Sequence, residues 1–206
     1  MFPPGLSAWS RIHLGWANAV VLDQDGEYEL EASEYNNTVY KITRNFPEGE
    51  YLLLENRQPI GYDSKIEQGG IAIYHVDDTA VGQRHLGMPA QEGWPENGSH
   101  YQVALLEASG RYDLEENLDV NAGVLWSDNS TLSELGPGYG GYVNPNTDSY
   151  RGGNITQTGI RIYDFSASGN IMTFKVAGVS QPSPAPSTDT LESIPADTLE
   201  DVVSIS

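Results

Sequence analysis

The sequence reads YLLLENR at residues 51–57 and, after a glycine-rich connection, GIAIYHVD at residues 70–77. Within these segments, residues 51–55 and 71–76 are near-continuous apolar runs of strand length. Runs of this length without polar alternation are typical of strands that are buried on both faces. We therefore expect two central, buried strands here, each followed by polar side chains.

Shorter runs of β-branched and aromatic residues predict further strands around this pair. Asp25-Gly26 separates the runs at residues 19–22 and 28–32, and an Asp-Gly pair in this position predicts a hairpin turn. A second hairpin is predicted near the C-terminus, where a four-residue turn separates residues 159–165 from residues 170–176. The remaining expected strands are residues 39–44 and 101–107.

The first 18 residues predict one short amphipathic helix. Apolar side chains recur there at steps of three and four residues, which is the helical period. Ser7 suits the N-cap position and Gly15 suits a helix stop. The side chains of this stripe are Leu6, Trp9, Ile12 (or His13) and Trp16.

The expected fold is mainly β: a mixed or antiparallel sheet, or a sandwich-like pair of sheets, with one short N-terminal helix and a disordered C-terminal tail. We expect the helix in residues 1–18, a β-rich domain in residues 19–178 and an acidic Pro/Ser/Thr-rich tail in residues 179–206. The tail contains no Lys or Arg and too few apolar residues to fold alone. Within the β-rich domain, residues 114–157 are rich in Asp, Asn, Gly and Ser. Loops of this length are usually functional or held by contacts other than a core.

Composition narrows the classes of partner. The formal net charge is −19, with 29 acidic against 10 basic residues, so the surface would repel nucleic acid but attract cations such as Ca²⁺. The simpler interpretation, which we favour, is that most of these acidic residues keep the protein in solution. The absence of Cys excludes disulfides, thiolate metal sites and Cys nucleophiles. No apolar stretch reaches the length of about 18 residues that a transmembrane helix needs. Neither the G-x-S-x-G motif nor a phosphate-binding loop occurs.

Three blocks of sequence carry a resemblance to a known family. They are LSAWSR with LGW (residues 6–16), ENR with YHVD (residues 55–77), and YVNPNTDSY continuing through GIRIY to MTFKV (residues 142–176). In this order they resemble the region after the zinc site of the immune inhibitor A family, which are secreted zinc metallopeptidases. The resemblance implies a β-rich region that supports a catalytic cleft, zinc as the cofactor of the intact family member, a protein or peptide substrate, and an extracellular location.

The zinc motif of that family, H-E-x-x-H, is absent from this sequence. It needs two His four residues apart on one helix with a Glu general base between them, and His13, His75, His85 and His100 include no such pair. We therefore expect a β-rich C-terminal part of such a peptidase, inactive by itself, with the zinc ligands outside this chain. Any export signal would lie upstream of Met1. The alternative is a secreted, non-catalytic β module that binds Ca²⁺ or a glycan.

The segment His75-Val76-Asp77-Asp78 is the first candidate site. On a strand, His75 and Asp77 point to one face and Asp78 to the other. A His with a carboxylate two residues along fits a metal ligand or an oriented general base. The structural alternative, which we favour, is a His at the end of a strand that a loop carboxylate caps.

The segment Glu55-Asn56-Arg57 is the second candidate. In a functional interpretation Glu55 would support the side chains that contact the substrate, or Arg57 would receive a substrate carboxylate on its planar guanidinium. In the structural interpretation, which we favour, Arg57 pairs with Glu55 or a neighbour and Asn56 turns the chain.

Asp119 and Asp128 are candidate Ca²⁺ ligands in the long loop, together with Asp113 and Asn121. No D-x-D-x-D-G series occurs, so solvated carboxylates are the simpler interpretation. Relatives in the family commonly carry a Gly-Asp-Ala-Gly-Asp-like loop here. Residues 120–124 have Asn and Val in place of its carboxylates, which implies a loss of charge for any ion bound there.

Two further features fit a surface role, but each has a simpler interpretation: sequons arise by chance in a chain rich in Asn, Ser and Thr, and aromatic side chains are more often anchors of the core or of loops. Sequons for N-glycosylation occur at Asn36, Asn97, Asn129 and Asn154. Trp94, Trp126 and the Tyr-rich residues 136–150 fit either a stacking platform for a sugar or aromatic anchors of the core.

Overall fold

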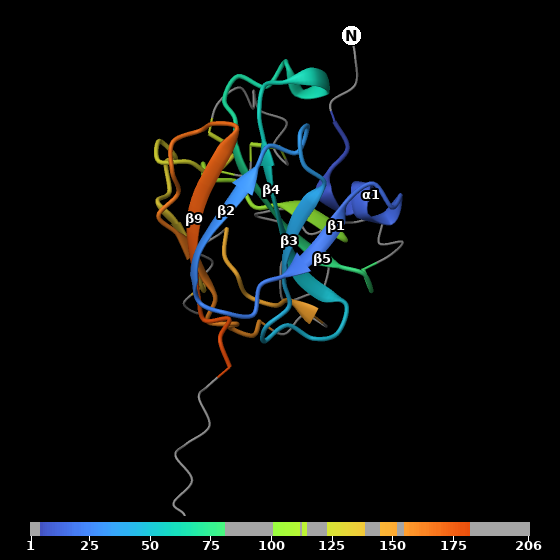
Figure 1. The fold of residues 1–206 in the computed structure, drawn as a ribbon. Helices are drawn as coiled ribbons and strands as arrows, with labels where there is room; N and C mark the ends of the chain where they lie inside the picture. Colours follow the sequence, from blue (N-terminus) through green and yellow to red (C-terminus); the bar gives the residue numbers. More distant parts are fainter. Residues whose placement is uncertain are drawn as a thin grey trace, which may run out of the picture.

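The computed structural model describes residues 5–80, 101–111, 113–114, 123–138, 145–151 and 155–181. Within these ranges the fold is mainly β, as predicted, with one short α-helix and two sheets (Figure 1). Sheet A has the strand order β1-β3-β4-β5-β6, and sheet B has the order β2-β9-β8-β7. The elements are α1 (Ala8–His13), β1 (Asn18–Val21), β2 (Gly26–Glu31), β3 (Thr38–Ile42), β4 (Glu50–Arg57), the 3₁₀ turn η1 (Gly61–Asp63), β5 (Gly70–Asp77), β6 (Val103–Leu105), β7 (Glu134–Leu135), β8 (Arg161–Tyr163) and β9 (Ile171–Ala177).

The two apolar runs form the central strands of sheet A. β4 and β5 pair antiparallel from Glu50 opposite Asp77 to Arg57 opposite Gly70. Every residue of β5 is buried, because both faces of the sheet are covered. The prediction of two central, buried strands is confirmed.

The inner face of sheet A packs against sheet B and forms the larger core. Side chains at every second position interdigitate there, which is the arrangement of a β-sandwich. Sheet A contributes Ile42, Leu52, Leu54, Ile71 and Ile73, and sheet B contributes Leu30, Leu135, Ile162, Met172, Phe174 and Val176.

Helix α1 covers the outer face of sheet A, on the side away from β9 (Figure 1). Ser7 is its N-cap and accepts a hydrogen bond from the Ser10 N–H, and Gly15 follows the helix with φ of +72°, as the sequence predicted. Ala8, Trp9 and Ile12 pack against the alternate side chains of the central strands. A second, smaller core therefore lies between helix and sheet.

The prediction of a hairpin around Asp25-Gly26 was wrong. β1 pairs with β3 in a parallel arrangement, which makes sheet A mixed, while β2 pairs with β9 in sheet B. The Asp25 side chain instead caps the chain after β9, where its Oδ1 accepts hydrogen bonds from the Val179 and Ser180 N–H groups at 2.8 and 2.9 Å. The long-range pairing of β2 with β9 outweighs the local turn signal.

The C-terminal hairpin of β8 and β9 is confirmed. The expected strand at 101–107 is present only as the short edge strand β6. The long stretch after residue 114 contributes β7, and it contributes Trp126, whose backbone pairs with Ile71 and whose side chain is fully buried.

The domain is packed as far as Val179, which is buried. The tail was expected at residues 179–206, but that start was wrong, because Val179 is buried and the Val179 and Ser180 N–H groups bond to Asp25. Residues 182–206 of the expected tail lie outside the described residues. Within the described ranges, no helix is long and apolar enough to cross a membrane.

Candidate functional site

His75 is buried on the inner face of β5. Its Nε2 atom lies 2.8 Å from Oε1 of Glu50 on the adjacent strand β4. The rings of Phe46 and Tyr150 flank the imidazole, with centroids 5.9 and 5.8 Å from it. His75 is only 4% exposed, so its imidazole has almost no surface that a substrate could contact. It serves as a buried partner of Glu50.

Glu50, which was not singled out from the sequence, is the centre of this cluster. Its carboxylate accepts hydrogen bonds from Ser149 Oγ at 2.6 Å and from the Tyr150 N–H at 3.0 Å. Burial raises the pKa of Glu50, but the interactions with His75, Ser149 and Tyr150 outweigh it and hold the pKa below its ordinary value of 4.5. The cluster ties residues 149–150 to the central strands.

The two aspartates after His75 are also engaged by the protein. Asp77 Oδ1 accepts from Thr79 N at 2.8 Å and from Arg151 Nη2 at 2.7 Å on the inner side of the sheet. Asp78 is exposed toward the outer face, where Trp9 Nε1 donates to it at 3.4 Å. The candidate segment therefore divides between two faces and forms no single site.

The described residues do not fit a catalytic zinc site. Such a site needs three protein ligands that converge on one open position. His75 is bonded to Glu50, and the ring of His13 lies against Trp9 on α1, whereas His85 and His100 lie outside the described ranges. Among the residues that the structure describes, no three His, Asp or Glu side chains are grouped to hold a metal ion. We assign no step of zinc chemistry to these side chains.

The predicted Ca²⁺ ligands are not assembled in the described part of the chain. Asp128 is exposed, and Asp119 lies outside the described residues. Asp113 is buried: its Oδ2 pairs with Arg111 at 3.0 Å, while its Oδ1 finds no hydrogen-bond donor among the described residues. Glu107 lies beside it and accepts the Asp113 N–H at 2.8 Å. One buried carboxylate oxygen therefore remains without a partner here.

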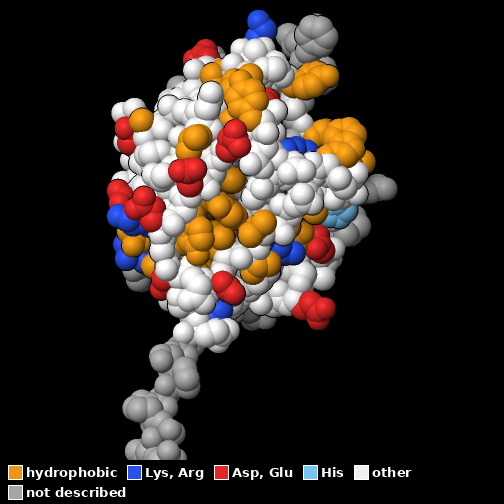
Figure 2. Space-filling view, viewed as in Figure 1, with side chains coloured by type: hydrophobic (Ala, Val, Ile, Leu, Met, Phe, Trp, Pro, Cys, Tyr) orange, Lys and Arg blue, Asp and Glu red, His pale blue; other side chains and the backbone are white. Residues whose placement is uncertain are grey.

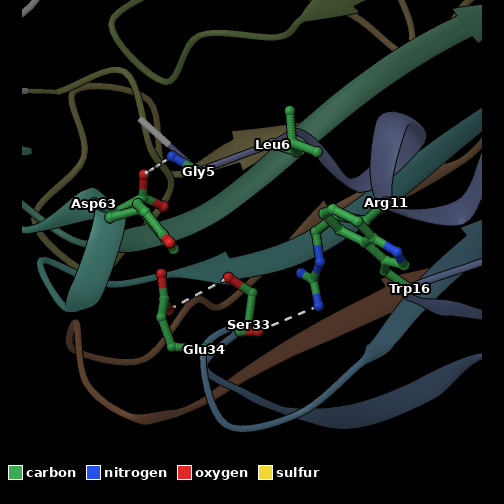
Figure 3. A pocket seen from close by; sticks show the side chains of 8 residues that line it. Gly5, Leu6, Arg11, Trp16, Ser33, Glu34 and Asp63 are labelled. Atoms are coloured by element: carbon green, nitrogen blue, oxygen red, sulfur yellow. Dashed lines mark hydrogen bonds between the residues drawn. The ribbon is translucent and has the colours of Figure 1, made fainter. Parts of the chain in front are cut away.

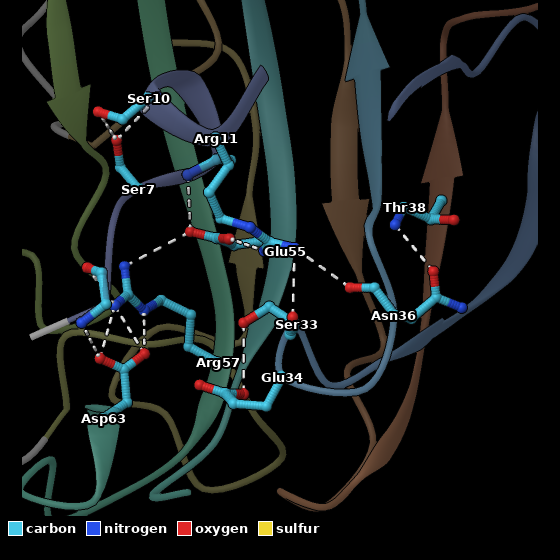
Figure 4. A network of polar contacts seen from close by, with 12 residues as sticks. Ser7, Ser10, Arg11, Ser33, Glu34, Asn36, Thr38, Glu55, Arg57 and Asp63 are labelled. Atoms are coloured by element: carbon cyan, nitrogen blue, oxygen red, sulfur yellow. Dashed lines mark hydrogen bonds and ion pairs between the residues drawn. The ribbon is translucent and has the colours of Figure 1, made fainter. Parts of the chain in front are cut away.

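A network of charged side chains lies on the outer face of sheet A, at the end of β4 (Figure 4). Glu55, which is 1% exposed, accepts hydrogen bonds through Oε1 from the Ala8 N–H and the Tyr74 hydroxyl, both at 2.9 Å. Its Oε2 accepts from Arg11 Nη1 at 3.1 Å. One buried carboxylate thus binds the first turn of α1, a helix side chain and β5.

Arg57 extends this network to η1 and the N-terminal segment. Its Nε and Nη2 atoms contact Asp63 at 2.9 and 2.6 Å, and Nη2 donates to the Gly5 carbonyl at 2.9 Å. Its Nη1 lies 3.5 Å from Glu55. The structure thus engages Arg57 in the way that the structural interpretation describes. Asp63 and Arg11 were missed, because only the folded chain brings them close.

The expectation that Asn56 turns the chain was wrong. Asn56 lies inside β4, fully buried on the inner face. Its Nδ2 donates to the carbonyls of Leu30 and Gly169, both at 3.0 Å, so it joins β2 and the β8–β9 turn to sheet A.

A cavity of about 390 Å³ opens beside the network, between the N-terminal segment, the turn after β2 and η1. In Figure 3, Asp63 and Glu34 lie on one side of it, with Arg11 and Trp16 on the other. Figure 2 shows exposed hydrophobic side chains on the same part of the surface, near α1 and η1. The lining residues are Gly5, Leu6, Arg11, Trp16, Ser33, Glu34, Tyr62 and Asp63.

The sequons differ in their surroundings. Asn129 is exposed, whereas the half-buried Asn36 uses its side chain to bond Glu31 and the Thr38 N–H. Asn97 and Asn154 lie outside the described residues. Of the predicted aromatic platform, Trp126 is buried and donates to the Leu106 carbonyl at 2.8 Å, which makes it a core anchor.

Comparisons with known proteins returned no match to a family model, to a curated protein or to a solved structure.

Proposed function

We propose that this chain is the β-rich C-terminal part of an immune-inhibitor-A-like zinc metallopeptidase, acting as a non-catalytic support for a zinc-bearing catalytic region outside it. The intact protein would act outside the cell on protein or peptide substrates. The proposal builds on the sequence resemblance. The observation that supports it is the contact in space between the three blocks that carry this resemblance.

The first and second blocks meet at Glu55. This carboxylate binds the Ala8 N–H and the Arg11 guanidinium of the first block, and the Tyr74 hydroxyl within the second. Segments that are far apart in the sequence are therefore joined through one buried side chain. Buried ionic groups are costly to desolvate, and we propose that this fold retains Glu55 because it fixes the first block against the second.

The second and third blocks meet at His75. The ring of Tyr150 lies 5.8 Å from the imidazole, and Glu50 joins the two by bonding both His75 and the Tyr150 N–H. The three blocks thus form one continuous unit along β4 and β5. Such a unit suits a rigid support, because the buried carboxylates of Glu50 and Glu55 each bond to more than one segment of the same domain.

The test of this proposal is proteolysis. The purified chain, supplemented with zinc, is incubated with fluorescent casein in the presence and absence of EDTA, beside an active zinc metallopeptidase as the positive control. We expect casein turnover at the rate of the blank. Chelator-sensitive turnover by this chain would contradict the proposal.

A second experiment addresses the catalytic region. The reading frame upstream of Met1 is translated and the N-terminus of the native protein is measured by mass spectrometry. A longer native chain that carries H-E-x-x-H supports the proposal, and a native chain that begins at Met1 contradicts it.

The buried Oδ1 atom of Asp113 supports a second candidate, a Ca²⁺-binding module. A bound cation would satisfy this oxygen, since Ca²⁺ takes carboxylate and carbonyl ligands. Ca²⁺ should then raise the melting temperature in chelator-treated protein, and Asp113→Asn should remove that rise. Equal melting temperatures with Ca²⁺ and with chelator would exclude this candidate.

A further inference from the structure

Glu34 is the carboxylate in the outer-face cavity that forms no ion pair with any described residue. It lies half-buried in the turn after β2, and its contact to Ser33 Oγ is a long one of 3.4 Å. Burial is the main cause that raises the pKa of Glu34 above 4.5, and the charge of Asp63 adds to it; the Glu34 N–H, Ser33 and the charge of Arg57 oppose this rise without cancelling it. The cavity therefore holds a carboxylate whose burial is only partly compensated by its own protein.

The charges around the cavity do not balance. Arg11 is paired with Glu55, and Arg57 is paired with Asp63 and Glu55. These groups and Glu34 make three carboxylates against two guanidinium groups, and Glu34 forms no ion pair with any described residue. One negative charge is left over at the cavity, within a chain whose net charge is −19.

Exposed aromatic rings accompany this charge. Trp16 and Tyr62 line the cavity although 62% and 67% of their surfaces are exposed. The faces of aromatic rings attract cations, and the Glu34 carboxylate would attract the same charge. Large aromatic side chains left at the rim of a hollow are also typical of recognition sites.

The cavity continues into a second hollow that passes Tyr35 and Asn37 and shares Arg11, Trp16 and Glu34 with the first. A ligand in the cavity thus has room to extend on one side over a polar surface. This shape suits a side chain that is attached to a polypeptide better than it suits a small free cation.

We infer that this cavity binds a lysine or arginine side chain of a peptide or protein, with the ammonium or guanidinium group at Glu34 and its aliphatic stem between Trp16 and Tyr62. The site is separate from the proposed supporting role and does not depend on it. The protein's own guanidinium groups stay in their ion pairs, and the incoming cation supplies the missing positive charge.

The experiment is a titration of the ¹⁵N-labelled chain with the peptide acetyl-Gly-Lys-Gly-amide, followed by NMR. The matched probe has norleucine in place of lysine, so that it keeps the stem and loses the charge. We expect the lysine peptide to shift the Trp16 indole N–H and the backbone signals of Ser33 and Glu34, and the norleucine peptide to bind at least about tenfold more weakly. Higher salt should weaken the binding of the lysine peptide, because salt screens the attraction between its ammonium group and Glu34.

Two variants test the assignment of residues. Glu34→Gln should weaken the binding of the lysine peptide about tenfold. It should change the melting temperature little, because this side chain is half-exposed and forms no ion pair with a described residue. Glu29→Gln removes the same charge from an exposed position on β2 and should leave binding unchanged. The inference would be overturned if the two peptides bound equally, or if both variants lost the same affinity. It would also be overturned if a neutral disaccharide shifted these signals and the lysine peptide did not.

Discussion

Arg11 and Glu55 form a nearly buried ion pair of 3.1 Å, although 44 residues separate them in the sequence. The pair fastens α1 to the outer face of β4. Glu55 is also the acceptor for the Ala8 N–H and the Tyr74 hydroxyl. The position of the N-terminal helix therefore depends on one carboxylate, in addition to the apolar contacts beneath it.

Glu55→Gln should destabilise the domain strongly. The substitution keeps the shape but removes the charge that compensates Arg11 and Arg57, and losing one member of a buried pair costs about 3–5 kcal/mol. Urea unfolding followed by far-UV circular dichroism measures this. The control is Glu134→Gln, since the Glu134–Arg161 pair is exposed, and its loss should cost no more than about 1 kcal/mol. Similar losses in the two variants would contradict the role of Glu55.

The sequence predicts local features of this fold well and long-range ones poorly. The N-cap Ser7, the stop at Gly15 and the buried runs of β4 and β5 follow from the spacing of neighbouring residues. The separation of β1 and β2 into different sheets does not, because it depends on the pairing of β2 with β9.

The clusters follow the same division. His75, Glu55 and Arg57 stand out in the sequence as polar side chains at the ends of apolar runs. Their partners do not stand out: Glu50 lies 25 residues from His75 in the chain, and Asp63 is part of no recognisable motif. Only the register of β4 with β5 brings Glu50 beside His75.

Gly178→Ala should be far more costly than Gly15→Ala. Both glycines have positive φ, +85° and +72°. A Cβ atom at Gly178 would lie 2.4 Å from the Gly159 carbonyl oxygen, whereas a Cβ atom at Gly15 would have no neighbouring atom within 4 Å. Backbone strain alone should cost about 1–2 kcal/mol at Gly15, and the collision should raise the cost to about 3 kcal/mol or more at Gly178. Thermal unfolding of the two variants measures the difference, and equal costs would show that the chain after β9 can move away.

Asn56→Ala should separate the two sheets at one end. The Asn56 amide satisfies the Leu30 and Gly169 carbonyls inside the protein, and a buried polar group without a partner costs about 1–3 kcal/mol. We therefore expect a loss of at least that size in urea unfolding, and faster hydrogen exchange in β2. Asn37→Ala, at an exposed position, is the control and should change stability by less than about 0.5 kcal/mol. A near-neutral Asn56→Ala would mean that water replaces the amide.

Stability should also depend on pH through two buried carboxyl groups whose pKa values shift in opposite directions on folding. The pKa of Glu50 is lowered on folding, so its stabilising contribution is present above about 4.5 and is lost as the pH falls below that value. Asp148 differs, because burial raises its pKa from 3.8 to about 6 and only the Gly138 N–H, at 3.1 Å, opposes this. Its Oδ1 atom is buried without a hydrogen-bond donor among the described residues.

Asp148→Asn should therefore stabilise the protein at neutral pH. Above about pH 6 the native protein must hold Asp148 as a buried anion, whereas below about 3.8 the group is protonated in both the folded and the unfolded chain, so its effect on stability disappears. Between these values the folded state binds more protons, and the wild type should lose stability relative to the variant as the pH rises. Melting temperatures from pH 4 to pH 7 measure this difference. The control is Asp164→Asn, at an exposed position with φ of +56° that Asn tolerates. It corrects for the change of one unit in the net charge. A difference that stays constant over this range would show that Asp148 is ionised without cost, and that a cation or water satisfies its free oxygen.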